Sequence, residues 1–100
     1  SVIDEAKAKI KGRGLKLVMP EGDDERIRAA AERFRREGLA EAIVFGPDDV
    51  PAATVAHVAL VQSRRGKMSE AMAMRLLKKP LYRAGAAVAA GEANAMLAGA

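Results

Sequence analysis

The fold of this chain is decided near its start by the stretch Leu17-Val-Met-Pro-Glu-Gly-Asp-Asp-Glu-Arg-Ile27. Leu15 to Met19 is a short and mainly apolar run, which is typical of a buried strand. Pro20 ends the strand, because proline lacks the amide hydrogen that a sheet ladder needs. Asp23 or Asp24 can then accept hydrogen bonds from the free amides of a helix, and their charge suits its positive end. The stretch therefore predicts a strand that runs directly into a helix.

A second strand is expected after this helix. The helix has one apolar stripe with helical spacing, and it ends at Gly38, which suits a left-handed carboxyl cap. Leu39 to Phe45 follows with a β-prone centre, and Gly46 begins a turn. Two strands joined through a helix favour a parallel, right-handed unit. The residues of the apolar stripe are Ile27, Ala30, Ala31 and Phe34.

The second half of the chain contains helix-forming segments and a last strand. Thr54 to Arg64 fits both a helix and an alternating strand, and we favour the helix. Ser69 can cap a helix that runs to Lys79. Pro80 suits the first turn of another helix, which stops at Gly91. This last helix would cover 81–90 and consists mainly of small residues. We also expect a leading helix over 1–11 and a strand over 95–98.

Composition limits the class of protein. One hundred residues suit one small domain. The chain has no cysteine, which excludes disulfides and thiolate nucleophiles and is compatible with a reducing cytoplasm. No apolar run approaches the roughly 18 residues of a membrane span, and residues 1–10 do not look like a signal peptide. We therefore expect a cytoplasmic protein that does not bind membranes.

A formal net charge of +4 raises the question of nucleic-acid binding. Acidic residues lie among the basic ones, as in Glu32-Arg-Phe-Arg-Arg-Glu37, and this mixture is typical of a solvated helix face. Proteins that bind single strands usually add aromatic stacking platforms, and this chain has only three aromatic residues. We therefore expect no nucleic-acid partner.

Two motifs resemble those of one enzyme family. Pro20-Glu-Gly-Asp-Asp-Glu-Arg26 and Gly91-Glu-Ala-Asn-Ala-Met-Leu-Ala-Gly-Ala100 are similar to segments of the phosphate acetyl/butyryl transferase (phosphotransacetylase) family. The resemblance implies an α/β fold, a parallel sheet with helices on both faces. This sheet would be part of the first subdomain of a two-subdomain, isocitrate/isopropylmalate dehydrogenase-like acyltransferase. Residues 1–100 would be the amino-terminal part of that domain.

The same resemblance implies a reaction. The complete protein would interconvert acetyl-CoA and phosphate with CoA and acetyl phosphate, with coenzyme A as a substrate and with no cofactor and no metal. A homo-oligomer, most simply a dimer, is implied. The family's catalytic residues lie downstream, so the resemblance assigns none to this chain. Three alternatives stay open: the acetyl-CoA-sensing, oligomerising carboxyl-terminal domain of an NADP-dependent malic enzyme, a phosphate butyryltransferase, and an unrelated interaction domain.

Arg64 and Arg65 are the candidate substrate-binding residues. Gln62-Ser-Arg-Arg-Gly-Lys-Met-Ser69 resembles a turn in which relatives carry a CoA- or phosphate-binding arginine four residues before the glycine. Gln62 occupies that position here, so the role does not transfer directly. Arg64 or Arg65 can approach the same space, and a guanidinium can grip a phosphate with two hydrogen bonds. The alternative is that both are solvent-facing side chains of a turn.

Other features have a structural and a functional interpretation. The turn around Asp23 lies where parallel sheets bind anions, but its carboxylates can also serve only to cap the helix. His57 is the only histidine and has no carboxylate close by in the sequence, so we do not expect a catalyst. Glu92 and Asn94 replace acids of the family's turn. Relatives also have a longer connection than residues 48–54 provide, which indicates either a natural deletion or an unresolved loop. We favour the loop and expect a chain break or high mobility over residues 46–54.

Overall fold

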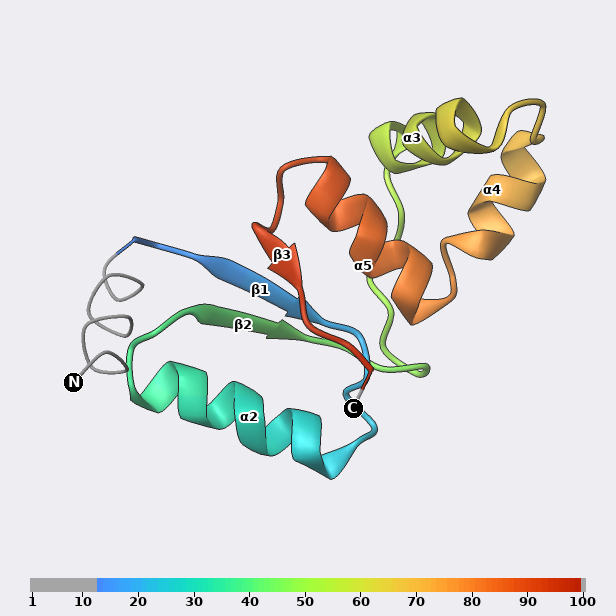
Figure 1. Cartoon of the computed structure of the whole chain (residues 1–100). Helices are drawn as coiled ribbons and strands as arrows, with labels where there is room; N and C mark the ends of the chain where they lie inside the picture. The colour runs from blue at the N-terminus through green and yellow to red at the C-terminus, as the bar shows by residue number, and fades with distance from the viewer. Residues whose placement is uncertain (1–12, 100) are drawn as a thin grey trace.

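The computed structural model describes residues 13–99, and it shows an α/β fold with one parallel sheet. The strands are β1 (Lys16–Met19), β2 (Glu41–Val44) and β3 (Ala95–Met96), in the order β2-β1-β3. Helix α2 (Glu25–Arg36) lies on one face of the sheet, and α5 (Pro80–Ala89) lies on the other (Figure 1). The predicted fold class and the three predicted strands are confirmed, although β3 is shorter than expected.

The central strand β1 supplies both layers of the core. Val18 and Met19 are completely buried and point to opposite faces, as successive strand residues must. Val18 packs with Phe45, Ala84 and Ala93 on the side of α5. Met19 packs on the side of α2, in a cluster with Ile27, Ala31 and Ala42. The apolar stripe predicted on the first helix therefore covers one face of the sheet.

Both ends of α2 are formed by the residues that the sequence indicates. Asp24 is the amino-terminal cap, and its side chain accepts a hydrogen bond from the amide of Arg26. At the other end Gly38 adopts a φ of 63°, a left-handed conformation that costs glycine little. The amide of Leu39 can then donate to the carbonyl of Phe34 at 3.0 Å, which closes the helix end.

A second group of helices packs outside α5. Thr54 caps α3 (Val55–Arg65) and Ser69 caps α4 (Glu70–Leu76), so the favoured helical interpretation of this region is confirmed. The three helices α3, α4 and α5 meet around the buried side chain of Leu77. The leading helix predicted over 1–11 lies outside the described residues. Within 13–99, no helix is both long and apolar enough to cross a membrane.

The connection between β2 and α3 corrects one expectation. Instead of a break, residues 46–54 form a continuous segment that leaves the sheet and passes α5 on its way to α3 (Figure 1). The amide of Gly46 donates to the Asp49 carboxylate at 2.5 Å, and the amide of Asp49 donates back to the Gly46 carbonyl at 3.3 Å. Arg83 holds the carbonyl of Pro51 at 3.2 Å. The chain therefore has no break here, and the hydrogen bonds of Asp49 and Arg83 hold the segment. The expected mobility stays a prediction.

Candidate functional site

The first candidate is the turn between β1 and α2, at the carboxyl edge of the sheet. The amide of Gly22 donates to the carbonyl of Phe45 at 3.2 Å, so the turn lies directly against the end of β2. A Cβ atom at position 22 would come within 3.0 Å of the Phe45 backbone and of Val44. Glu21 also accepts a hydrogen bond from the amide of Gly99, which follows the end of β3. The turn is therefore a packed junction of all three strand ends.

The negative charge at the start of α2 is satisfied within the turn. Arg26 contacts Asp24 through its side chain at 2.8 Å and also donates its backbone amide to the same carboxylate. These hydrogen bonds from Arg26 lower the pKa of Asp24 from 3.8 to about 2, and the same side-chain bond raises the pKa of Arg26. The Asp24 carboxylate thus occupies the place where a helix start would hold an external anion. This geometry favours the capping interpretation of the motif.

The pair predicts a pH dependence of stability. Because the pKa of Asp24 is lower in the folded than in the unfolded protein, its contribution is complete above about pH 4 and is lost as the pH falls toward 2. Asn can cap a helix but carries no charge. We expect Asp24→Asn to lower the urea midpoint at pH 6 and to match the parent protein near pH 2. Asp23→Asn is the control, and an equal pH-dependent loss in that variant would contradict the assignment.

The second candidate is a groove between α3 and α5, and it brings the predicted residues Arg64 and Arg65 together. The groove has a volume of about 370 Å³, and both arginines line it. Its walls are mainly apolar side chains of the two helices, and Gly85 lies in its lining. A mostly apolar groove with a few polar groups at one end is the usual form of a ligand site.

Tyr82 contacts Arg65, one of the two arginines that line this groove. The Arg65 guanidinium lies over the Tyr82 ring at 5.2 Å from the ring centre, and it donates to the Tyr82 hydroxyl at 2.9 Å. Both interactions hold a guanidinium in a fixed orientation. Gln62, four residues before Gly66, donates to the Met68 carbonyl at 3.2 Å and closes the turn after α3. Tyr82 had no predicted role, and only its aromatic side chain near Pro80 could have drawn attention to it.

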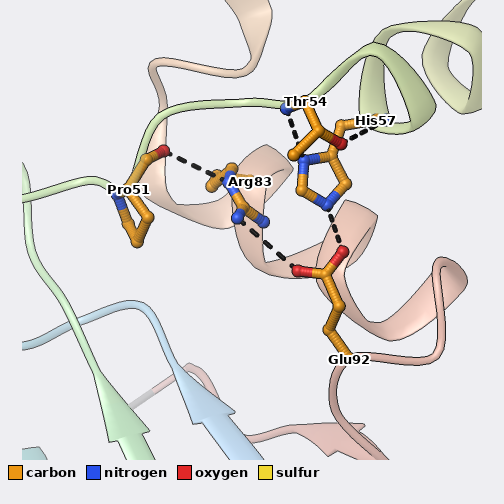
Figure 2. Close-up of polar contacts among 5 residues, drawn as sticks. All are labelled: Pro51, Thr54, His57, Arg83 and Glu92. Carbon is orange, nitrogen blue, oxygen red and sulfur yellow. Dashed lines mark hydrogen bonds and ion pairs between the residues drawn. The ribbon is translucent and has the colours of Figure 1, made fainter.

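A third feature is a buried polar cluster around His57 (Figure 2). His57 is completely buried, and its Nδ1 atom accepts a hydrogen bond from the Thr54 amide at 3.0 Å. Its Nε2 atom lies 2.6 Å from the Glu92 carboxylate. Arg83, also buried, lies 3.7 Å from the other Glu92 oxygen, so one half-exposed carboxylate serves two buried side chains. The cluster joins the 51–54 segment, the start of α3, α5 and the turn before β3.

The partners of His57 determine its tautomer. Because Nδ1 accepts from a backbone amide, the neutral ring carries its hydrogen on Nε2 and donates it to Glu92. A fully buried ring with both nitrogens engaged has no free position for a substrate proton. The structure thus supports a structural role for His57, as the sequence indicated. The sequence did not reveal Glu92 as its partner, because the two residues are 35 positions apart.

Asn94 fixes the turn before β3 to the start of β1. Its side chain accepts a hydrogen bond from the Lys16 amide at 2.7 Å, and its own amide donates to the Lys16 carbonyl at 2.8 Å. The side-chain bond needs only an oxygen acceptor, and the second bond uses the backbone amide. Asparagine can therefore hold this turn as an acidic residue would, without a charge. In the part of the chain that the structure describes, no group of three acidic or histidine residues is placed to hold a metal ion.

Comparison with known proteins finds similar sequences and structures among the phosphate acetyltransferases. No protein-family model matches the chain. The phosphate acetyltransferase of Staphylococcus aureus is 32% identical over 117 residues, which cover 94% of this chain and 36% of that enzyme. The phosphate acetyltransferase of Staphylococcus epidermidis is 27% identical over 115 residues, with 92% of this chain and 35% of that enzyme covered. The chain thus spans about a third of the length of these curated relatives.

Solved structures agree with the sequence matches. The crystal structure of a phosphotransacetylase from Streptococcus pyogenes superimposes with a TM-score of 0.86 and 28% identity, covering 99% of this chain and 37% of that one. The EutD phosphotransacetylase from Staphylococcus aureus gives a TM-score of 0.82 and 26% identity, covering 95% and 36%. Sequence and fold therefore lead to the same group of enzymes.

Proposed function

Because this chain is homologous to the phosphate acetyltransferases, we propose that the complete protein transfers an acetyl group between coenzyme A and phosphate. In the forward reaction a phosphate oxygen bonds to the thioester carbonyl carbon, the carbon–sulfur bond breaks, and CoA leaves as its thiolate. The observation that carries the proposal is the match over 94% of the chain, together with a shared fold. Residues 13–99 would form one wall of the site, in the amino-terminal part of the enzyme domain.

The groove between α3 and α5 supports a substrate-binding role for Arg64 and Arg65. Both line one groove, and a guanidinium forms strong paired hydrogen bonds with phosphate oxygens. The Tyr82 contact holds the Arg65 head group in place before any ligand arrives. The phosphates of CoA or the phosphate co-substrate would be the ligands. Catalysis would then rest on positioning phosphate beside the thioester and stabilising the oxyanion that forms there.

Three further properties belong to this proposal. The protein would act in the cytoplasm, which its lack of cysteine suits. It would assemble as a homo-oligomer, most simply a dimer. CoA would enter and leave as a substrate, and no other cofactor would take part.

The test is a CoA-release assay on the full-length protein. We expect acetyl-CoA to yield free CoA only when phosphate is supplied, with acetyl phosphate as the second product. Faster reaction with butyryl-CoA would identify a phosphate butyryltransferase. NADP-dependent oxidation of malate that acetyl-CoA inhibits, without any phosphate-dependent release, would contradict the proposal in favour of a regulatory domain.

The two arginines predict a kinetic result. Arg64→Ala and Arg65→Ala should each raise the KM for CoA or phosphate about tenfold or more, because a hydrogen bond to a charged group contributes roughly 1.5 to 3 kcal/mol. Arg36→Ala, in the last turn of α2, is the matched control and should leave both KM values unchanged. If both groove variants keep the parent KM values within twofold, the two arginines are surface charges and the assignment is wrong.

A further inference from the structure

The positive charge of this protein is concentrated in one segment. Residues 64–79, which we name the basic corner, contain six of the 17 lysines and arginines and one of the 13 acidic residues. The basic corner therefore carries a formal charge of +5, and the rest of the chain carries −1. Its cations are Arg64, Arg65, Lys67, Arg75, Lys78 and Lys79, and all six are exposed.

The cations of the basic corner differ from those of α2 in their pairing. On α2, Arg26 pairs with Asp24 at 2.8 Å, and Arg33 pairs with Glu37 at 2.6 Å. Among residues 13–99, no ion pair reaches any cation of the basic corner, and Arg65 contacts only the neutral Tyr82. Residues 23–37, which include α2, also carry five acidic and five basic side chains, so the electrostatic field of α2 is largely cancelled, whereas that of the basic corner extends into solvent.

The fold places these charges together beside the groove. The basic corner comprises the end of α3, the whole of α4 and the turn into α5, which project from the sheet in Figure 1. Helix α4 has seven residues and is about 10 Å long at the usual helical rise, close to one Debye length at moderate salt. The electrostatic fields of these cations therefore overlap in the solvent around the basic corner. Two of them, Arg64 and Arg65, line the groove itself.

We propose that the basic corner is an electrostatic steering surface for a ligand that carries several phosphate groups. Resting on the proposed function, this ligand is the CoA moiety of the acyl substrate, whose phosphates give it several negative charges. The unpaired cations raise the local concentration of the ligand and guide it to the groove. Steering of this kind raises association rates by roughly 10 to 1,000-fold at low salt and fades as ions screen the charges.

The test removes three lysines that do not line the α3–α5 groove. In the full-length protein, Lys67→Gln, Lys78→Gln and Lys79→Gln combined should lower kcat/KM for acetyl-CoA about tenfold at low salt, with kcat unchanged. The ratio of parent to variant should approach one as the salt concentration rises toward about 1 M. Arg26→Gln, Arg33→Gln and Arg36→Gln combined remove the same charge from α2 and should change kcat/KM less than twofold.

A binding measurement separates this proposal from the proposed function. The association rate of CoA should fall in the lysine variant at low salt, and dephospho-CoA, which lacks one phosphate, should show a smaller fall. Such a result without any phosphate-dependent turnover would uphold the steering surface and overturn the proposed reaction. Normal turnover with equal rates in the lysine and α2 variants would overturn the steering surface alone. Loss of single-stranded oligonucleotide binding with unchanged CoA association would overturn it in favour of a nucleic-acid surface.

Discussion

Leu77→Ala is expected to lower the free energy of unfolding by about 3 kcal/mol, within the usual range of 2 to 5 kcal/mol for such core substitutions. Leu77 is 1% exposed and packs against α3, α4 and α5 at the point where these helices meet. Its buried neighbours Val58, Ala73 and Ala86 are small, so they cannot fill the cavity that the substitution leaves. The loss should therefore include both the transfer of the side chain and an open cavity.

Urea unfolding of the purified protein measures this effect. Leu81→Ala is the matched control, because it deletes the same atoms from a side chain that is 53% exposed. We expect the control to change stability by less than about 0.5 kcal/mol, as surface substitutions usually do. Equal losses in the two variants would show that Leu77 does not hold the three helices together.

Glu92→Ala is expected to lower the free energy of unfolding by about 2 to 3 kcal/mol, because it leaves two buried polar side chains without their shared acceptor. His57 would lose the partner of its Nε2 hydrogen at 2.6 Å, and Arg83 would lose its nearest carboxylate. Breaking a fully buried ion pair costs roughly 3 to 5 kcal/mol, and the half-exposed Glu92 side chain reduces that cost.

Three variants resolve the contributions of this cluster. Glu92→Gln keeps an oxygen acceptor for His57 but removes the charge beside Arg83, so its loss should lie between those of the parent and Glu92→Ala. Arg83→Met together with Glu92→Gln replaces the buried charge with an apolar chain of similar length and should recover part of that loss. Glu70→Ala, an exposed acid on α4, is the control. A Glu92→Ala protein as stable as Glu70→Ala would exclude the cluster as a source of stability.

Much of the fold follows from local chemistry and could be predicted. Pro20, Asp24 and Gly38 each act on the backbone within a few residues, so the end of β1 and both ends of α2 were visible in the sequence. The apolar stripe of α2 predicted which face meets the sheet. The short connection at 46–54 was misjudged, because its closure depends on Asp49 and on Arg83, which lies far along the chain.

The candidate site was less predictable than the fold. Arg64 and Arg65 were named from a turn motif, and the structure places both at the α3–α5 groove. The Arg65–Tyr82 and His57–Glu92 contacts were not predicted, because their partners lie 17 and 35 residues apart and no spacing rule links them. Contacts of that range depend on how α3 packs on α5, and the amphipathic pattern of either helix alone does not fix that packing.

The position of β1 between its two neighbours has a consequence for synthesis. Leu17 pairs with Ala42 of β2 on one edge of β1 and with Ala95 of β3 on the other. During synthesis, the edge that pairs with β3 therefore stays unpaired for much longer. At the usual 5 to 20 residues per second, the 78 residues between Lys16 and Asn94 take roughly 4 to 16 seconds to translate. During that interval the nascent chain presents an unpaired strand edge, which is where β-rich chains aggregate. Slower translation between Val44 and Ala95 should therefore lower the yield of folded protein more than an equal delay before Lys16.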